Sequence, residues 1–173
     1  MNTTKTILSI DASYKWELHQ MDFKSSFLNH YLNEYIYMQQ PPPFLSVESS
    51  SLVWKLHKSL YGLKQAPRAW YDKIDAYFLN NGFKRCIYDP NLYVKHVDDN
   101  IIVIVLYLDD IIINGIQLLL IQNMKSELQK QFEMTDLGIL HYFFGFQIWH
   151  MEDGILLSQP KYAIDLLVLE FHH

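Results

Sequence analysis

The amino-acid sequence predicts one domain of the α+β class, with helices packed against a mainly antiparallel sheet. Three observations lead to this prediction. Some segments carry apolar residues at helical spacing, others look like short strands joined by hairpin turns, and the two kinds follow one another in mixed order. A chain of 173 residues, half of them hydrophobic, is long enough to bury the core of a single domain.

The N-terminal segment predicts a helix followed by a strand. Thr3 or Thr4 can cap a helix that runs toward Tyr14, because a threonine hydroxyl accepts hydrogen bonds from the free N–H groups of a first turn. Residues 16–23 then look like a strand in which Leu18 and Met21 supply the apolar bulk. Asp22 lies at the end of this strand.

The next segment predicts two short strands separated by a long loop. Residues 35–38 favour a strand, and residues 39–51 favour an irregular loop because they contain three prolines and four serines. Residues 53–56 look like a strand again. From Pro67 the apolar positions fall at helical spacing, and we expect that helix to end near Asn81.

Two hairpins are predicted in the middle of the chain. The first joins residues 92–97 to residues 101–106 through a polar turn. The second follows directly, with Asp109 and Asp110 at its tip and residues 111–113 as its return strand.

The C-terminal part predicts a helix, a hairpin and a last helix. Residues 121–132 show amphipathic helical spacing. Residues 142–149 are expected to pair with residues 155–157, and Ser158 with Pro160 is expected to open the final helix.

The composition indicates an intracellular protein without a membrane span. Cys86 is the single cysteine, which excludes an internal disulfide and any zinc site made of several cysteines. The longest apolar stretch, residues 101–113, is interrupted by Asp109 and Asp110 and is too short to cross a bilayer. The N-terminus lacks the pattern of a secretory signal.

Charge is unevenly distributed along the chain. The formal net charge is −5, yet eight basic residues and three aspartates between positions 55 and 95 give that segment +5, so the remainder carries −10. The basic residues are Lys55, Lys58, Lys64, Arg68, Lys73, Lys84, Arg85 and Lys95. This segment either tracks phosphate groups or is an ordinary solvated surface.

The most informative feature is the pair Asp109 and Asp110 inside an otherwise apolar hairpin. Adjacent carboxylates near a core are costly unless they are solvated, protonated or neutralised by a cation. The alternative is that they simply form a hairpin turn, for which aspartate is well suited. Asp22 also ends an apolar strand, so three carboxylates can converge as ligands for two metal ions about 3.5–4 Å apart. Asp22 as a helix N-cap remains the alternative.

Seven motifs, in this order and spacing, resemble the reverse transcriptases of copia-type LTR retrotransposons. They are QMDFKSSFLN at 20–29, YMQQPP at 37–42, KSLYGLKQAPRAWY at 58–71, YLDD at 107–110, FEMTDLG at 132–138, YFFGF at 142–146 and LSQPKYA at 157–163. Together they extend over nearly the whole chain, and the segment 59–71 is the most specific. The resemblance implies a ferredoxin-like polymerase palm with incomplete fingers, so that residues 1–173 are one partial domain of a larger polyprotein.

The same resemblance implies the chemistry. Asp22, Asp109 and Asp110 would be the catalytic carboxylates that bind two Mg²⁺ ions, with Mn²⁺ as a possible substitute. The function would be RNA-directed DNA synthesis, the transfer of a nucleotide to a primer 3′ hydroxyl. The partners would be an RNA template, a DNA or tRNA primer and deoxynucleoside triphosphates.

Further residues gain roles only from the resemblance. Phe27 would pack beneath the incoming sugar and help select deoxynucleotides, or else be a core phenylalanine. Nucleotide or template contacts would come from Gly62, Lys64, Pro67, Arg68 and Tyr107, although Lys64 and Arg68 can also be solvated loop charges. A primer grip would be formed by Tyr142, Phe144, Gly145 and Phe146, unless this is an ordinary edge hairpin.

The chain also departs from the family pattern. We expect the upstream fingers region that would hold the triphosphate to be missing from this chain, and aromatic Phe144 and Phe146 replace aliphatic residues of the grip. We therefore expect weak or no polymerisation by this chain alone. Two alternatives remain: a catalytically silent retrotransposon remnant that at most binds nucleic acid, and another two-metal enzyme such as a nucleotide cyclase.

Overall fold

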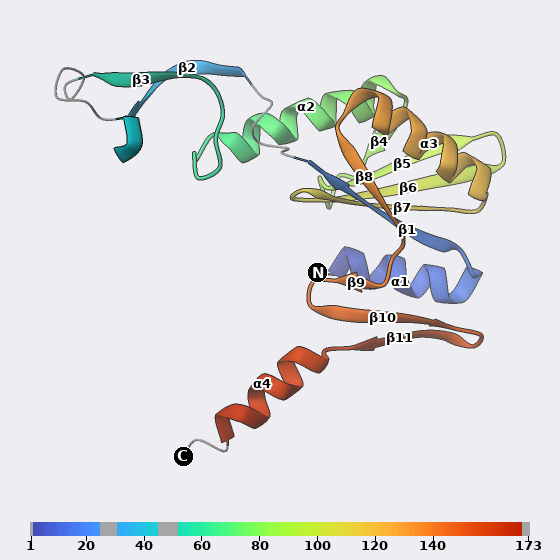
Figure 1. Cartoon of the computed structure of the whole chain (residues 1–173). Coiled ribbons are helices and arrows are strands. Elements are labelled where there is room, and N and C mark those ends of the chain that lie inside the picture. Colours follow the sequence, from blue (N-terminus) through green and yellow to red (C-terminus); the bar gives the residue numbers. More distant parts are fainter. Residues whose placement is uncertain (1, 25–30, 45–51, 171–173) are drawn as a thin grey trace. The chain divides into compact units, whose positions relative to one another are not determined.

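The computed structural model describes residues 2–24, 31–44 and 52–170, and these fall into two compact units. The first unit comprises Met1–Lys24 and Leu79–His173, and the second comprises Ser25–Phe78. The described elements are four α-helices, one short 3₁₀ helix and strands in three antiparallel sheets, so the α+β prediction is confirmed (Figure 1).

The first unit contains a six-stranded sheet in the order β4-β5-β6-β7-β1-β8. Its central members are β1 (Glu17–Phe23), β6 (Asn100–Tyr107) and β7 (Asp110–Gly115). The remaining strands are β4 (Lys84–Arg85), β5 (Leu92–Val97) and β8 (Met134–Ile139). All neighbouring pairs run antiparallel.

Two helices cover opposite faces of this sheet (Figure 1). On one face, α1 (Asn2–Tyr14) contributes Ile7 and Leu8 to a core cluster with Leu18 of β1 and Ile112 of β7. On the other face lies α3 (Leu118–Gln131), whose buried side chains are Ile121, Met124, Lys125 and Leu128. Strand residues alternate between these two faces, so even-numbered residues of β1 face α1 and odd-numbered ones face α3.

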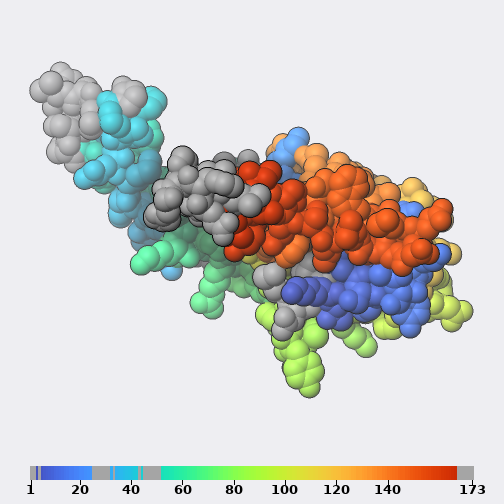
Figure 2. Space-filling model, turned by 90° about the horizontal axis from the view of Figure 1, so that it is seen from below, coloured from blue at the N-terminus to red at the C-terminus, as the bar shows by residue number. Residues whose placement is uncertain are grey.

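A three-stranded sheet, ordered β11-β10-β9, packs beside α1. Its strands are β9 (Tyr142–Phe143), β10 (Phe146–Met151) and β11 (Gly154–Ser158), and α4 (Pro160–Glu170) follows. Figure 2 shows α1 in blue against this orange hairpin, consistent with the contacts between α1 and β11. The sheet buries Phe143 and Ile148 in the same core cluster as Leu18.

The second unit is built from β2 (Tyr31–Gln39), the 3₁₀ helix η1 (Pro42–Phe44), β3 (Val53–Lys58) and most of α2 (Ala66–Asn80). The two strands pair with each other in a separate ribbon. Ala66, Trp70, Ile74 and Phe78 are the buried residues of α2, which confirms the helical spacing found from Pro67 onward.

Several boundaries expected from the sequence are wrong. The helix α1 begins at Asn2, so Thr3 and Thr4 lie inside it and do not cap it; the Thr3 hydroxyl hydrogen-bonds the Asp89 carboxylate instead. A 3₁₀ helix at Pro42–Phe44 interrupts the segment expected to be entirely irregular, because proline fixes a backbone angle that a first helical turn accepts.

Two strand assignments also need correction. Residues 142–149 are not one strand, because Phe144 and Gly145 form a turn between β9 and β10. The strands β4 and β8 were not expected at all. The β8 segment contains Asp136 and Gly138, which are unfavourable in strands, and it becomes one by pairing with β1.

Candidate active site

Strand register brings the three expected catalytic carboxylates together. In the antiparallel pair of β1 and β7, Asp22 lies directly opposite Asp110. The backbone N–H of Phe23 donates a hydrogen bond to the carbonyl oxygen of Asp109 at 2.8 Å. Directly opposed residues in antiparallel strands point to the same face, so Asp22 and Asp110 share the face that carries α1.

The turn before β7 differs in detail from the expectation. Asp110 is the first residue of β7 and pairs with Tyr107, so the tip consists of Leu108 and Asp109. Leu108 has φ of 50°, a left-handed conformation that a branched side chain seldom adopts. A two-residue turn of this kind lets β6 reverse directly into β7 and keeps both carboxylates at the strand end.

The electrostatics of this site are those of a group of like charges. Burial raises the pKa of Asp22 above its usual value, and the negative charges of Asp110 and then Asp109 raise it further. All three carboxyl groups are half-buried. The amide of Gln20, two residues before Asp22, donates a hydrogen bond to the Asp110 carboxylate at 2.9 Å. A neutral amide does not supply a counter-charge to Asp110.

The donor set fits a hard divalent cation. Carboxylate oxygens are the ligands that Mg²⁺ prefers, and a cation would relieve the repulsion that raises the pKa of Asp22. Within residues 2–24, 31–44 and 52–170, no three His, Cys, Asp or Glu side chains form a preassembled metal cage. Magnesium rarely uses such cages: it takes one or two carboxylates and completes its shell with water and substrate phosphates.

The hairpin expected to be a primer grip lies beside this strand end. Its two turn residues, Phe144 and Gly145, have φ of 54° and 76°, as two-residue hairpin turns require. The Tyr107 ring lies 4.0 Å from the Phe144 ring and 6.1 Å from the Phe143 ring, between centroids. Since Tyr107 pairs with Asp110, this aromatic contact joins the hairpin turn to the carboxylates. Tyr142 is exposed and Phe146 is half-buried.

Four of the residues expected to contact nucleotide and template belong to the second unit, whereas Tyr107 belongs to the first. Gly62, Lys64, Pro67 and Arg68 are all exposed, in the segment that leads into α2 and in its first turn. Gly62 has φ of 92° with open space around it, so its turn conformation is what favours glycine there. Phe27 lies outside the described residues.

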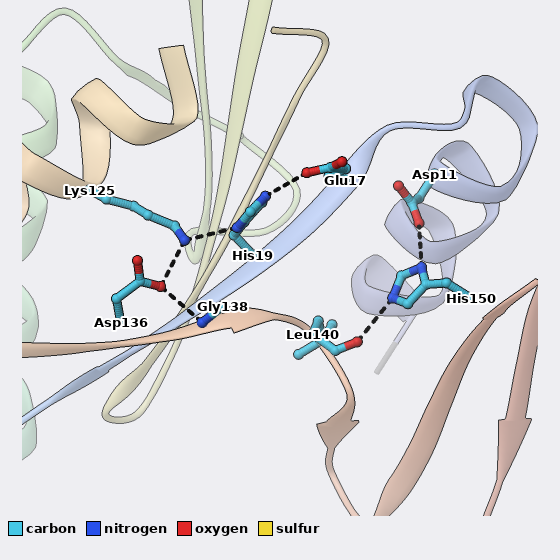
Figure 3. Close-up of polar contacts among 8 residues, drawn as sticks. All are labelled: Asp11, Glu17, His19, Lys125, Asp136, Gly138, Leu140 and His150. Carbon is cyan, nitrogen blue, oxygen red and sulfur yellow. Dashed lines mark hydrogen bonds and ion pairs between the residues drawn. The ribbon is translucent and has the colours of Figure 1, made fainter. Parts of the chain in front are cut away.

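A partly buried ion-pair network was missed by the sequence analysis. On the α3 face of β1, Lys125 Nζ lies 2.7 Å from Asp136 Oδ1 and 2.8 Å from His19 Nδ1 (Figure 3). His19 Nε2 lies 3.0 Å from Glu17 Oε2. One signal was available, because Lys125 occupies the apolar stripe of α3 between Ile121 and Leu128, where a lysine needs a partner.

A second buried carboxyl group was also missed. Asp11 on α1 is 2% exposed; its Oδ2 lies 3.8 Å from His150 Nδ1, and its Oδ1 has no hydrogen-bond partner (Figure 3). Burial raises the pKa of Asp11 to about 6, His150 opposes this rise, and Glu17 adds to it. The Nε2 of His150 is 3.0 Å from the Leu140 carbonyl oxygen, so Nε2 carries a proton.

Comparison with known proteins identifies the family. The reverse transcriptase (RNA-dependent DNA polymerase) family matches residues 1–171. The chain belongs to this family. The match confirms the resemblance inferred from the motifs, and the family is one of enzymes.

Individual relatives are polyproteins of transposons. The chain is 37% identical over 163 residues to the retrovirus-related Pol polyprotein from transposon RE1 of Arabidopsis thaliana, which covers 94% of the chain and 11% of that protein. It is 41% identical over 165 residues to the polyprotein from transposon TNT 1-94 of Nicotiana tabacum, covering 94% and 12%. A putative transposon Ty5-1 protein of Saccharomyces cerevisiae is 36% identical over 143 residues, covering 82% and 46%.

The chain therefore corresponds to a small part of the Pol polyproteins it resembles, about a ninth of their length. No solved structure matches it significantly. None of the described helices is both long and apolar enough to cross a membrane.

Proposed function

We propose that this chain is the palm-containing part of an RNA-directed DNA polymerase from a copia-type retrotransposon, forming one partial domain. The observation that supports this most directly is the strand register. Asp22 is opposite Asp110, and Phe23 is hydrogen-bonded to Asp109, although these residues are far apart in the sequence. A polymerase palm needs carboxylates from two such strands at one point.

The order of the central strands supports a ferredoxin-like palm. Along the chain the elements run β1, α2, β6, β7, α3 and β8, and in the sheet the four strands are ordered β6-β7-β1-β8. A ferredoxin-like fold has the same βαββαβ succession, which supports this proposal. Both central strands, β1 and β7, carry the carboxylates at one end.

Within this proposal Asp22, Asp109 and Asp110 hold two Mg²⁺ ions, which Mn²⁺ can replace. When bound, the cations would lower the charge on the triphosphate and activate the primer 3′ hydroxyl. Gln20 positions the Asp110 carboxylate through its 2.9 Å hydrogen bond. The β9–β10 turn, held against Tyr107 by Phe144, supports the primer end over the carboxylates.

The remaining roles come from the family. Gly62, Lys64, Pro67 and Arg68 contact the incoming nucleotide and the template, and Phe27 excludes a 2′-hydroxyl. The substrates are an RNA template, a DNA or tRNA primer and deoxynucleoside triphosphates. Because the chain matches only a ninth of the RE1 and TNT 1-94 polyproteins, it acts natively as part of a larger, intracellular polyprotein.

The first test is metal-dependent nucleotide binding by the purified chain. We expect a fluorescent deoxynucleoside triphosphate to bind in the presence of Mg²⁺ and to be released by EDTA. Asp109→Asn should remove the Mg²⁺ dependence, whereas Asp153→Asn, in the exposed β10–β11 turn, should leave it unchanged.

The outcome separates the two main hypotheses. Binding that is absent, or indifferent to Mg²⁺ and to Asp109→Asn, would instead identify a catalytically silent remnant. Primer extension on an RNA template is expected to be weak or absent for this chain alone, and robust extension would contradict that expectation.

A further inference from the structure

One exposed face of the β2–β3 ribbon combines two aromatic rings with a lysine, and the site roles proposed above do not use it. We propose that this face, formed by Tyr35, Tyr37, Lys55 and His57 and here called the tyrosine–lysine face, binds single-stranded nucleic acid. The identification of that strand as the RNA template rests on the proposed function.

The strand pairing sets these side chains side by side. Tyr37 lies directly opposite Lys55, so the two point to the same face of the ribbon. The Nζ of Lys55 lies 4.0 Å from the centroid of the Tyr35 ring, which adds Tyr35 to this face. His57 follows Lys55 by two positions on β3 and joins it by strand alternation.

The side chains are available to a ligand. Tyr35 is 76% exposed and Tyr37 is 59% exposed, and Lys55 and His57 are exposed as well. Large aromatic side chains that are this exposed contribute little to a core. Neighbouring exposed rings of this kind are characteristic of binding surfaces.

The opposite face of the ribbon has a different composition. Ile36, Met38 and Leu56 are half-buried there, and Trp54 lies 5.3 Å from Phe44 between ring centroids. The ribbon is therefore amphipathic, and its apolar side is accounted for by packing. The tyrosine–lysine face is the polar side of the ribbon. Apolar packing therefore does not explain why two tyrosines are present there.

Charge favours a polyanion as the ligand. The lysine of this face is Lys55, whereas Lys58 lies on the other face by strand alternation. In residues 31–44 and 52–58 the single carboxylate is Glu34, which accepts a hydrogen bond from Gln65 at 3.1 Å. Bases stack on exposed aromatic rings in a sequence-tolerant manner while nearby cations neutralise phosphates. Lysine is depleted in protein–protein interfaces, so a protein ligand is the weaker alternative.

Binding is tested on the full chain by fluorescence anisotropy with labelled oligo(U) RNA and oligo(dT) DNA of about 12 nucleotides. The titrations contain EDTA and no nucleotide, so they do not depend on the proposed catalytic site. We expect Tyr35→Ala combined with Tyr37→Ala to weaken binding at least tenfold. Tyr37→Phe, which keeps the ring, should bind like the wild type.

Two controls make the test specific. The double variant Tyr88→Ala with Tyr162→Ala removes tyrosines that are 96% and 61% exposed in the first unit, and it should leave the affinity unchanged. Lys55→Gln should reduce the slope of log affinity against log salt by about 0.7, the contribution of one phosphate contact to a single strand.

The outcomes distinguish this inference from the proposed function. Undiminished binding by the Tyr35 and Tyr37 double variant, or no binding by the wild type, would overturn the inference. Tyrosine-dependent binding without Mg²⁺-dependent nucleotide binding would support it while contradicting the polymerase proposal. Binding of oligo(dT) alone would overturn the assignment to an RNA template, and binding of both strands or of oligo(U) alone would support it.

Discussion

Asp22 and Asp136 lie on adjacent strands of the six-stranded sheet, and their carboxyl groups behave in opposite ways. Asp22 pairs with Thr135, and its neighbour Met21 pairs with Asp136. Burial raises the pKa of both carboxyl groups, but the final pKa of Asp136 is lowered. The lowering comes from hydrogen bonds donated by Lys125 and by the Gly138 backbone, and from the positive charge of Lys125.

The difference depends on whether the chain itself supplies a counter-charge to the carboxylate. Asp136 lies on the α3 face of the sheet, where Lys125 is 2.7 Å away and supplies the counter-charge. Asp22 lies on the opposite face, where its nearest charges are the carboxylates of Asp110 and Asp109. A cluster that carries excess negative charge is suited to receive a cation from outside the chain.

Asp11 makes the contrast sharper, because it is the most buried of these carboxyl groups and has a poor partner. Its raised pKa of about 6 against a usual value of 3.8 means that the folded chain binds its proton more tightly than the unfolded chain does. Stability from this group is therefore complete below about pH 4 and is lost as the pH rises through about 6. The whole change corresponds to about 3 kcal/mol.

The largest expected effect is a stabilisation by Asp11→Asn. The substitution removes the charge whose burial is unfavourable, so the free energy of unfolding at about pH 7.5 should rise by about 2 kcal/mol. The gain should disappear below about pH 3, where Asp11 is protonated in both states. Urea unfolding across this pH range measures both effects. If the free energies of unfolding of the variant and the wild type changed with pH in parallel, Asp11 would not be the source of the pH dependence.

The next largest effect is expected in the cluster of Lys125, Asp136 and His19. Lys125→Met keeps the apolar stem but leaves Asp136 and His19 without their cation, so unfolding should become easier by about 1.5 kcal/mol, since Asp136 is partly exposed to water. Lys130→Met is the matched control, since Lys130 forms an exposed pair with Glu127 on the same helix and should cost less than about 0.5 kcal/mol. Equal losses from both variants would refute the distinction.

The smallest expected effect is in the cluster of Asp22, Asp109 and Asp110. Without metal, Asp22→Asn should stabilise the chain by less than about 1 kcal/mol, because it relieves repulsion from Asp110 and Asp109. Millimolar MgCl₂ should raise the melting temperature of the wild type and of Asp136→Asn, and leave that of Asp22→Asn unchanged. In the wild type this rise should shrink as the pH falls through the raised pKa of Asp22, since protons compete with the metal. If Mg²⁺ left the melting temperature of the wild type unchanged, the proposed difference between the Asp22 and Asp136 clusters would be wrong.

Much of the site was predictable because it depends on local patterns. The apolar bulk of residues 16–23 indicated β1, the continuous apolar runs at 101–106 and 111–113 indicated β6 and β7, and the carboxylates stood out at strand ends. The YFFGF motif indicated a hairpin, and both of its turn residues adopt left-handed conformations. The sequence predicted that Asp22 and Asp110 lie close together but not that they are directly opposite each other, which the strand register shows.

Other features could not be predicted because their partners are distant. The strand β8 contains Asp136 and Gly138, which disfavour strands, and it exists because the edge of β1 offers hydrogen bonds. Lys125 lies in an apolar stripe that by itself predicts a hydrophobic residue, and only the sheet beneath α3 supplies Asp136 and His19. The contact between Asp11 and His150 likewise joins the first helix to a late strand.

By itself, the sequence of this chain determined the family, the α+β class and the positions of the three carboxylates at the ends of apolar strands. Only the tertiary structure decided which charges meet: two carboxylates beside Asp22, a lysine beside Asp136 and a histidine beside Asp11. The physical reason is that strand register and helix packing bring together residues of separate elements, 11 positions apart for Lys125 and Asp136 and 90 for Gln20 and Asp110. A pKa follows from that local arrangement, and residue type alone cannot supply it.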